Sequence, residues 1–254
     1  MVTHSVNVHR DHSDNEKGVL GQPYRRMAIV VGVLLIVCSV ASVLSAAPLG
    51  SMLDSPVDLT RLAANDDRVV LAALIEFVAA ASGAGIAIAL YPVLRYYGRA
   101  VAFGAAAARV VGGVLVLVGT LSLLALLTLA QESVSSGSTD SAATDASVQV
   151  LLAVRDWGAN FMVSLPFLLG AGMYYYLMYR SAIVPRWLSV WGILGVVVSL
   201  VATLYAGFTQ DFGLATVSTA LNVPIGLQEM VLAVWLIAKG FNREWKLPAA
   251  ESRA

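Results

Sequence analysis

Histidine, cysteine and charge are scarce in the long apolar stretches of this chain, and their scarcity excludes several kinds of chemistry. The 254-residue sequence has three histidines, all near its beginning, and one cysteine, Cys38. One cysteine cannot form an intrachain disulfide. No apolar run carries the histidine that haem ligation, a zinc protease or a histidine proton relay needs. A Ser–His pair for proteolysis and a Gly-rich phosphate loop are also absent. We therefore expect no enzyme and no cofactor.

The three histidines lie in a polar segment of mixed charge. His4, His9 and His12, with Asp11 and Asp14, could hold a metal ion weakly. A polar segment offers no fixed scaffold for the ligands, however, and metal affinity depends on one. We therefore expect solvated histidines and no metal site.

Charged residues are too few for an ordinary soluble domain. They make up 13% of the chain, against about 25% in soluble domains, while hydrophobic residues make up 58%. The formal net charge is zero, so no basic excess points to nucleic acid. The deficit is concentrated in long apolar runs, which is typical of membrane proteins.

Six apolar runs are long enough to cross a ~30 Å hydrocarbon core as helices, which takes about 20 residues. They cover residues 27–46, 69–94, 100–130, 148–179, 187–208 and 216–238. The sequence therefore predicts an all-α, polytopic membrane protein, with a six-helix transmembrane bundle over residues 27–239. Residues 1–26 are predicted to form a disordered tail, residues 47–68 a loop and residues 240–254 a second tail.

The positions of lysine and arginine predict which side of the membrane each end faces. The loops on one side hold only Arg61 and Arg68. The tails and the turns on the other side hold twelve of the 16 basic residues: Arg10, Lys17, Arg25, Arg26, Arg95, Arg99, Arg180, Arg186, Lys239, Arg243, Lys246 and Arg253. Cytoplasmic loops carry an excess of Lys and Arg. We therefore expect both termini in the cytoplasm and the chain in the cell membrane.

Two charges are predicted to meet near the middle of the membrane. Arg109 lies ten residues after Arg99, and Glu229 lies ten residues before Lys239, so each is about 15 Å from the cytoplasmic end of its helix. An arginine at this depth is costly unless it has an acidic partner. The sequence therefore predicts an Arg109–Glu229 pair, with a backbone carbonyl freed by Pro224 as a further acceptor.

A second polar group is predicted closer to the opposite end. Glu76 is expected to face the bundle interior, because a carboxylate facing lipid would be costly. Arg155 either reaches down to Glu76 or lies among the headgroups. The tyrosines over residues 174–179, with Trp187 and Trp191, are expected to form an aromatic belt. The full set of candidate intramembrane polar residues is Glu76, Arg109, Arg155, Asp156, Asn160, Asn222, Gln228 and Glu229.

Short motifs in a fixed order resemble a known family. They are Leu74-Ile75-Glu76-Phe77, the segment 89–95 around Tyr91-Pro92, Ala108-Arg109-Val110-Val111, Arg155-Asp156-Trp157, Tyr179-Arg180-Ser181, the segment 184–192 and Pro224-Ile225-Gly226-Leu227-Gln228-Glu229. Together they resemble, over residues 27–241, a bacterial multi-pass membrane family catalogued as domain of unknown function 4386. The resemblance implies the six-helix bundle and carries no assigned activity.

Two kinds of function remain open from the sequence. The first is a non-catalytic structural or regulatory membrane protein, in which the Arg–Glu pair fixes helix packing. The alternative is a small-solute or proton-coupled ion carrier that uses Glu76, Arg109 and Glu229. The expected partners are the lipid bilayer and either another membrane protein or a second copy of the chain. The sequence does not indicate a small-molecule ligand.

Overall fold

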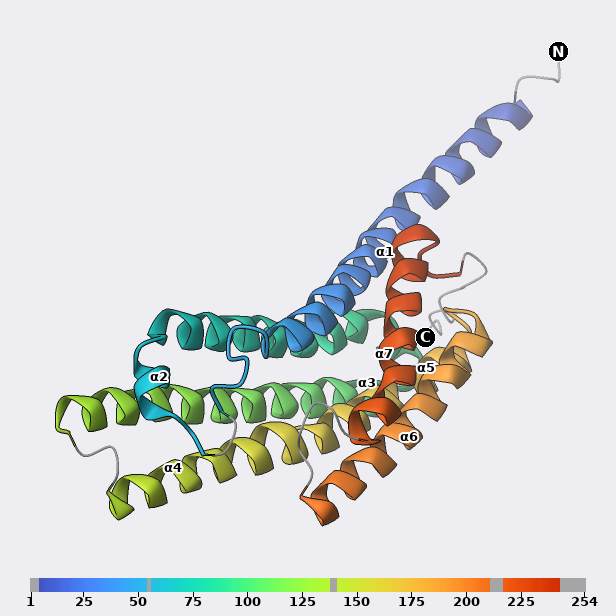
Figure 1. The fold of residues 1–254 in the computed structure, drawn as a ribbon. Helices are drawn as coiled ribbons and strands as arrows, with labels where there is room; N and C mark the ends of the chain where they lie inside the picture. Colours follow the sequence, from blue (N-terminus) through green and yellow to red (C-terminus); the bar gives the residue numbers. More distant parts are fainter. Residues whose placement is uncertain (1–4, 54–55, 138–140, 211–216, 243–254) are drawn as a thin grey trace.

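The computed structural model describes residues 5–53, 56–137, 141–210 and 217–242, and these residues form helices without any β-strand (Figure 1). The elements are α1 Ser5–Leu44, α2 Leu59–Ala63, α3 Asp66–Ser135, α4 Ala142–Arg155, the π-helix η1 Asp156–Met162, α5 Ser164–Ser181, α6 Arg186–Thr209 and α7 Val217–Ala238. Four helices of these described ranges are long and apolar enough to cross a membrane: Tyr24–Leu44, α3, α6 and Ala220–Ala238.

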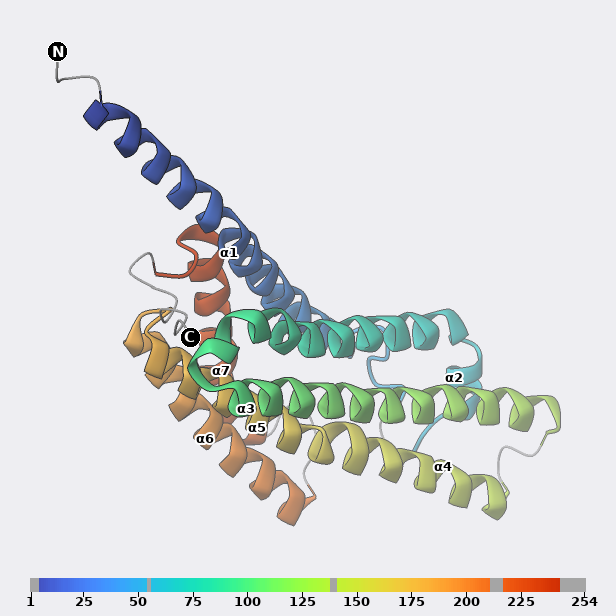
Figure 2. The same cartoon turned by 180° about the vertical axis from the view of Figure 1, so that it is seen from behind.

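The helix α3 is a single run of 70 residues that doubles back on itself. Inside it, Gly98 leaves the helical region, with φ 172° and ψ 87°. The arms before and after Gly98 lie antiparallel in both ribbon views (Figures 1 and 2). The sequence predicted separate helices over residues 69–94 and 100–130. One extended residue reverses the chain here, so the count of six separate helices is not what the structure has.

The predicted helix 148–179 is divided into α4, η1 and α5. Pro166 lies within this stretch and prolines commonly kink helices, but the irregular backbone precedes it. A proline has no N–H, and its ring excludes the carbonyl four residues earlier, here that of Met162. The Val163 N–H donates to the carbonyl of Gly158 at 3.1 Å, a bond over five residues that is typical of a π-helix. The distortion is therefore placed one turn before the proline.

The segment 47–68 is more ordered than the loop that we predicted. It contains α2, whose N-cap Asp58 accepts a hydrogen bond from the Arg61 N–H at 3.0 Å. Apolar side chains of this segment pack on the ends of α3 and α4 in a small core: Leu49, Met52, Leu59, Leu62, Val69, Ala72, Leu123, Leu126, Leu127, Ala130 and Val148. The long arms of α3 therefore extend into a second, separate apolar cluster.

The helix α1 starts at Ser5, where the sequence predicted a disordered tail over residues 1–26. A helix needs only hydrogen bonds along its own backbone, so the lack of an apolar period does not exclude one. The first half of α1 extends away from the other helices (Figures 1 and 2). Residues 1–4 and 243–254 lie outside the described residues, and the boundaries of both tails stay predictions.

The main core lies where α1, α5, α6 and α7 meet the middle of α3. Tyr174 and Tyr175 are at its centre, with exposed fractions of 1% and 0%, so they are not part of an aromatic belt as predicted. Tyr176 and Tyr179, by contrast, are exposed. Arg25 of α1 donates to the carbonyls of Leu236 and Ile237 at the end of α7, at 3.3 and 2.8 Å.

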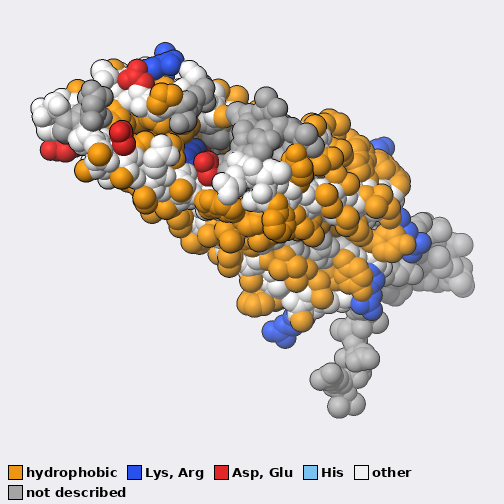
Figure 3. All heavy atoms as spheres, turned by 60° about the horizontal axis from the view of Figure 1, so that its bottom comes forward, with side chains coloured by type: hydrophobic (Ala, Val, Ile, Leu, Met, Phe, Trp, Pro, Cys, Tyr) orange, Lys and Arg blue, Asp and Glu red, His pale blue; other side chains and the backbone are white. Residues whose placement is uncertain are grey.

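Charges of opposite sign gather at opposite ends of the molecule (Figure 3). The end formed by α2 and by the outer ends of α3 and α4 carries exposed Asp58, Asp66, Asp67, Glu132 and Asp145, with Arg61 and Arg68. The other end carries exposed Arg25, Arg26, Arg95, Arg99, Arg180, Arg186 and Lys239. Hydrophobic side chains cover most of the face between the two ends.

We predict that Gly112→Ala destabilises the fold. A Cβ at Gly112 would lie 2.2 Å from Cδ2 of Phe167, so the α5 ring must move. Overpacking of this kind costs about 1–3 kcal/mol. Gly226→Ala is the matched control, because a Cβ there meets nothing within 4 Å. Thermal unfolding of the purified variants in one detergent measures both, and equal midpoints for the two would contradict the packing.

Candidate functional site

Arg109 is buried in the middle of the bundle, with an exposed fraction of 4%. Its Nη2 lies 3.7 Å from Oε1 of Glu229 and donates a hydrogen bond to the Tyr174 hydroxyl at 2.7 Å. The guanidinium also lies over the rings of Phe167 and Tyr174, 4.8 and 5.3 Å from their centroids. The predicted pair with Glu229 is therefore present. It is joined by a tyrosine and by two cation–π contacts that the sequence did not reveal.

Neighbouring helices close around this pair because small residues let them approach. A Cβ at Gly170 of α5 would lie 2.9 Å from Cγ of Arg109, so only a glycine leaves room for the arginine stem. On the other side, Ser39 of α1 donates to Oε2 of Glu229 at 3.4 Å. The centre thus joins α1, α3, α5 and α7. We predicted a carbonyl freed by Pro224 as a further acceptor, but the contact partner is Tyr174.

Gln228 and Tyr175 form a second contact beside the first. The Tyr175 hydroxyl donates to Oε1 of Gln228 at 2.5 Å, and Nε2 of Gln228 donates to the Leu188 carbonyl at 3.1 Å. Gln228 is fully buried. The Tyr174 and Tyr175 rings meet edge to face, with centroids 4.5 Å apart. Tyr175 therefore binds Gln228 of α7 directly, while the adjacent Tyr174 is joined to Glu229 of α7 through Arg109, and the pattern fixes the rotation of both helices.

Glu76 has its own set of partners. Arg155 donates to its carboxylate through Nη2 at 2.5 Å and Nη1 at 3.5 Å, and Thr120 donates to Oε2 at 2.7 Å. Nη1 of Arg155 also reaches the Gly119 carbonyl at 3.2 Å. The exposed fraction of Glu76 is 8%, so it faces the interior as predicted. Of the two alternatives for Arg155, the structure has the one in which it binds Glu76.

The bend of α3 explains why Glu76 meets Thr120. Glu76 lies 22 residues before Gly98, and Thr120 lies 22 residues after it. Two antiparallel arms of equal length bring such residues to the same level. The same count of residues from the bend shows that the Arg109 and Glu76 centres lie at different levels along the arms of α3. Arg109 and Thr120 are eleven residues apart on one arm, about 16 Å along a helix.

The charged candidate residues with printed ion pairs form two centres, Arg109 with Glu229 and Glu76 with Arg155, and Gln228 lies beside the first. Asp156 lies in η1 and Asn222 on α7; both are half-buried and neither is without an interaction. The Asn160 side chain is not among those described. No group of three His, Cys, Asp or Glu in the described part of the chain could hold a metal ion. The side chains of His4, His9 and His12 fall outside that part.

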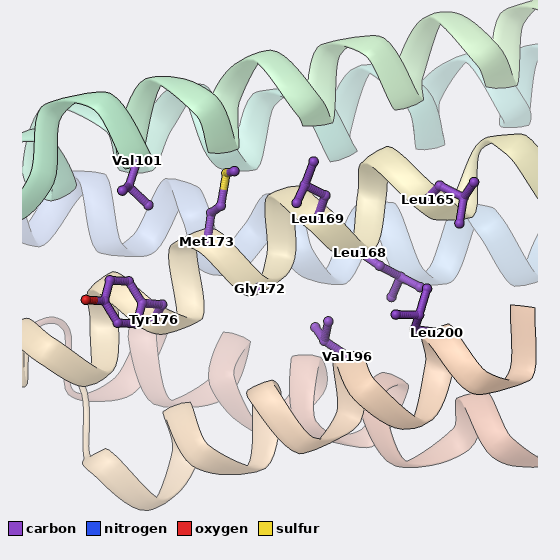
Figure 4. A pocket seen from close by; sticks show the side chains of 9 residues that line it. All are labelled: Val101, Leu165, Leu168, Leu169, Gly172, Met173, Tyr176, Val196 and Leu200. Atoms are coloured by element: carbon purple, nitrogen blue, oxygen red, sulfur yellow. The ribbon is translucent and has the colours of Figure 1, made fainter. Parts of the chain in front are cut away.

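A groove between α3, α5 and α6 adjoins this region but is chemically different (Figure 4). Its volume is about 490 Å³, and its walls include Val101, Leu165, Leu169, Gly172, Tyr176 and Leu200. None of the eight candidate residues lines it. The groove therefore does not connect the charged centres to the outside.

We predict that Thr120→Val destabilises the protein by about 1.5–3 kcal/mol, the usual contribution of a hydrogen bond to a charged group. The variant keeps the shape of the side chain and removes the donor to Glu76. Thr128→Val is the control, since the Thr128 hydroxyl donates only to the Leu124 carbonyl of its own exposed helix face. Chemical unfolding in detergent measures the difference. If both variants lose the same stability, Thr120 does not support the carboxylate.

Comparison with known proteins gives a family and no closer relative. No curated protein and no solved structure matches this chain. The model of the family described as domain of unknown function (DUF4386) matches residues 30–240, which include every helix from the apolar part of α1 to the end of α7. Both charged centres and the bend at Gly98 lie within the match. The chain therefore belongs to the DUF4386 family.

Proposed function

We propose that this protein is a non-catalytic, multi-pass protein of the cell membrane, in which two buried Arg–Glu pairs fix the packing of the helices. Its role is structural or regulatory, and it acts through contacts with another membrane protein or a second copy. The observation that carries the proposal is that the protein itself supplies the partners of both pairs. Arg155 and Thr120 bind Glu76, while Arg109 lies between Glu229 and Tyr174.

The chemistry of the pairs supports a packing role. A buried charge left without a partner is strongly destabilising, whereas a paired and hydrogen-bonded one is tolerated. Each pair joins helices that are distant in the sequence: α3 to the end of α4, and α3 to α7. Such pairs select one arrangement of apolar helices among many that pack equally well.

The arrangement of the helices supports six membrane crossings with both termini in the cytoplasm. The segments are Tyr24–Leu44, the two arms of α3, the run from α4 to α5, α6 and α7. An even number places both termini on one side. The end that carries exposed Arg25, Arg95 and Arg180 is rich in basic residues, as cytoplasmic ends are.

A second function is favoured by a different observation. The Glu229 side chain is 21% exposed, and Nε of Arg109 has no hydrogen-bond partner within the described part of the chain. A carrier needs a charged group that a solute or proton can reach. We therefore keep a small-solute or proton-coupled carrier as the alternative, with Arg109 and Glu229 as its centre.

The topology predicts opposite labelling at the two ends. In a Cys38→Ser background, Ser147→Cys at the acidic end should react with a membrane-impermeant maleimide added to intact cells. Lys239→Cys should react only after the cells are opened, because basic ends remain in the cytoplasm. Both positions are exposed. Labelling of position 239 in intact cells, with position 147 protected, would reverse the proposed orientation.

The central pair predicts non-additive effects of neutral variants. Glu229→Gln leaves Arg109 unpaired, which costs at least about 2.5 kcal/mol on insertion scales. Arg109→Gln with Glu229→Gln should therefore be tolerated better than Glu229→Gln alone, with Glu132→Gln at an exposed position as control. The yield of folded protein and its unfolding midpoint measure this. Additive losses would contradict a packing pair.

The same double variant separates the two functions. For the carrier, it should fold normally and lose proton-coupled uptake, which a pH-sensitive dye inside proteoliposomes detects. If the protein is structural, proteoliposomes of the unmodified protein and of the double variant should give the same dye signal as vesicles without protein, because neither conducts protons.

A further inference from the structure

We propose that the groove between α3, α5 and α6 binds one acyl chain of an anionic phospholipid, whose phosphate group is held by Arg180 and Arg99. The proposal goes beyond the packing role of the charged pairs. It rests on the proposed membrane insertion, but not on whether the protein is structural or a carrier.

The shape of the groove fits a single lipid chain. Its volume of about 490 Å³ falls within the range of small-molecule sites, about 300–1,000 Å³. Figure 4 shows Val101 and Tyr176 at one end and Leu165 at the other. From Leu165 to Tyr176 is eleven residues, about 16 Å along a helix. That length is close to half of a ~30 Å hydrocarbon core, the depth that the chains of one leaflet occupy.

The walls of the groove are open to lipid rather than closed by protein. Leu169 is 57% exposed, Leu200 39% and Tyr176 48%, although all three line the groove. Gly172 contributes no side chain to the groove, and a Cβ there would make only an ordinary contact, 3.7 Å, with Val196. Inside a bilayer the molecules that meet such a surface are lipid chains.

The α5 wall ends in a positive charge on the same helix face. Leu165, Leu169, Gly172 and Tyr176 follow one another at spacings of three and four residues, which places them along a single stripe. One further step of four residues reaches Arg180, which is exposed. The stripe therefore runs from apolar side chains through a tyrosine hydroxyl to an arginine, the order in which a phospholipid presents its chain, ester region and phosphate.

A second arginine lies at the same end. Arg99 is exposed and belongs to the first turn of the arm that contributes Val101. Basic residues near the cytoplasmic surface attract anionic lipids by about 1 kcal/mol each, and basic pockets between membrane helices bind lipid headgroups. Two arginines therefore favour an anionic headgroup over a zwitterionic one.

The test compares two lipids on the full-length protein. The protein is reconstituted in vesicles of phosphatidylcholine that contain a minor share of phosphatidylglycerol, and bound lipid is identified by native mass spectrometry after gentle extraction. We expect phosphatidylglycerol to be enriched at least 5-fold over its share in the vesicle. Arg99→Gln with Arg180→Gln should remove the enrichment. Arg26→Gln with Lys239→Gln, which removes the same charge from the same end, should leave it unchanged.

A second set of variants tests the groove itself. Leu169→Trp should fill it and reduce bound lipid of both headgroups at least 3-fold, while Leu121→Trp, at an exposed position outside it, should not. Enrichment lost equally in the Arg99/Arg180 and the Arg26/Lys239 double variants would mean a diffuse charge effect and would overturn the site. So would competition by glycerol phosphate, which has no acyl chain. A change from dimer to monomer in Leu169→Trp without loss of lipid would assign the groove to a second copy instead.

Failure of this proposal can be told apart from failure of the proposed function. Absence of lipid enrichment in a protein whose maleimide labelling has the expected pattern overturns the lipid site alone. A reversed labelling pattern overturns the topology, while binding in symmetric vesicles stays measurable.

Discussion

A charge cannot be left unpaired away from water, and this constraint organises the molecule. Arg109 lies where α1, α3, α5 and α7 meet, so each of these helices has to present something acceptable to a guanidinium. The carboxylate of Glu229 supplies the opposite charge, Tyr174 an acceptor and a ring face, and Gly170 empty space. Apolar surfaces of helices are nearly interchangeable in a bilayer, so polar contacts of this kind decide which surfaces meet.

Glu76 repeats the solution near the other end of the bundle, with shorter bonds and a more exposed arginine. Its centre depends on the bend of α3 at Gly98. Thr120 reaches Glu76 because the two residues lie at equal distances from the bend, on antiparallel arms. The two centres hold different neighbours, α4 in one case and α7 in the other. Together the two centres fix the position of the two arms of α3 relative to the rest of the chain.

The sequence indicated how far along its helix each charged residue lies, but not toward which neighbouring helix its side chain points. Arg109 and Glu229 were paired correctly because both could be counted from basic residues, Arg99 and Lys239, at the same end of the molecule. Depth does not say which way a side chain points around its helix axis, so Arg155 was left with two alternatives. For the same reason Tyr174 was assigned to a surface belt. Its burial depends on how closely α5 approaches α3, which Gly170 permits but does not reveal in one sequence. The site of the π-helix was also missed. A proline such as Pro166 indicates that a helix is distorted, but not whether the irregular backbone lies before or after it.

The contact between Arg25 and the end of α7 has a consequence for how the protein is made. Arg25 belongs to the first helix to be synthesised, and the carbonyls that it binds, those of Leu236 and Ile237, belong to the last. Glu229 is on that same last helix. Until translation is nearly complete, Arg109 has no opposite charge and Arg25 has no helix end to bind. A chain that ends before α7 therefore has a buried Arg109 that lacks the carboxylate of Glu229, and an Arg25 that lacks the carbonyls of Leu236 and Ile237.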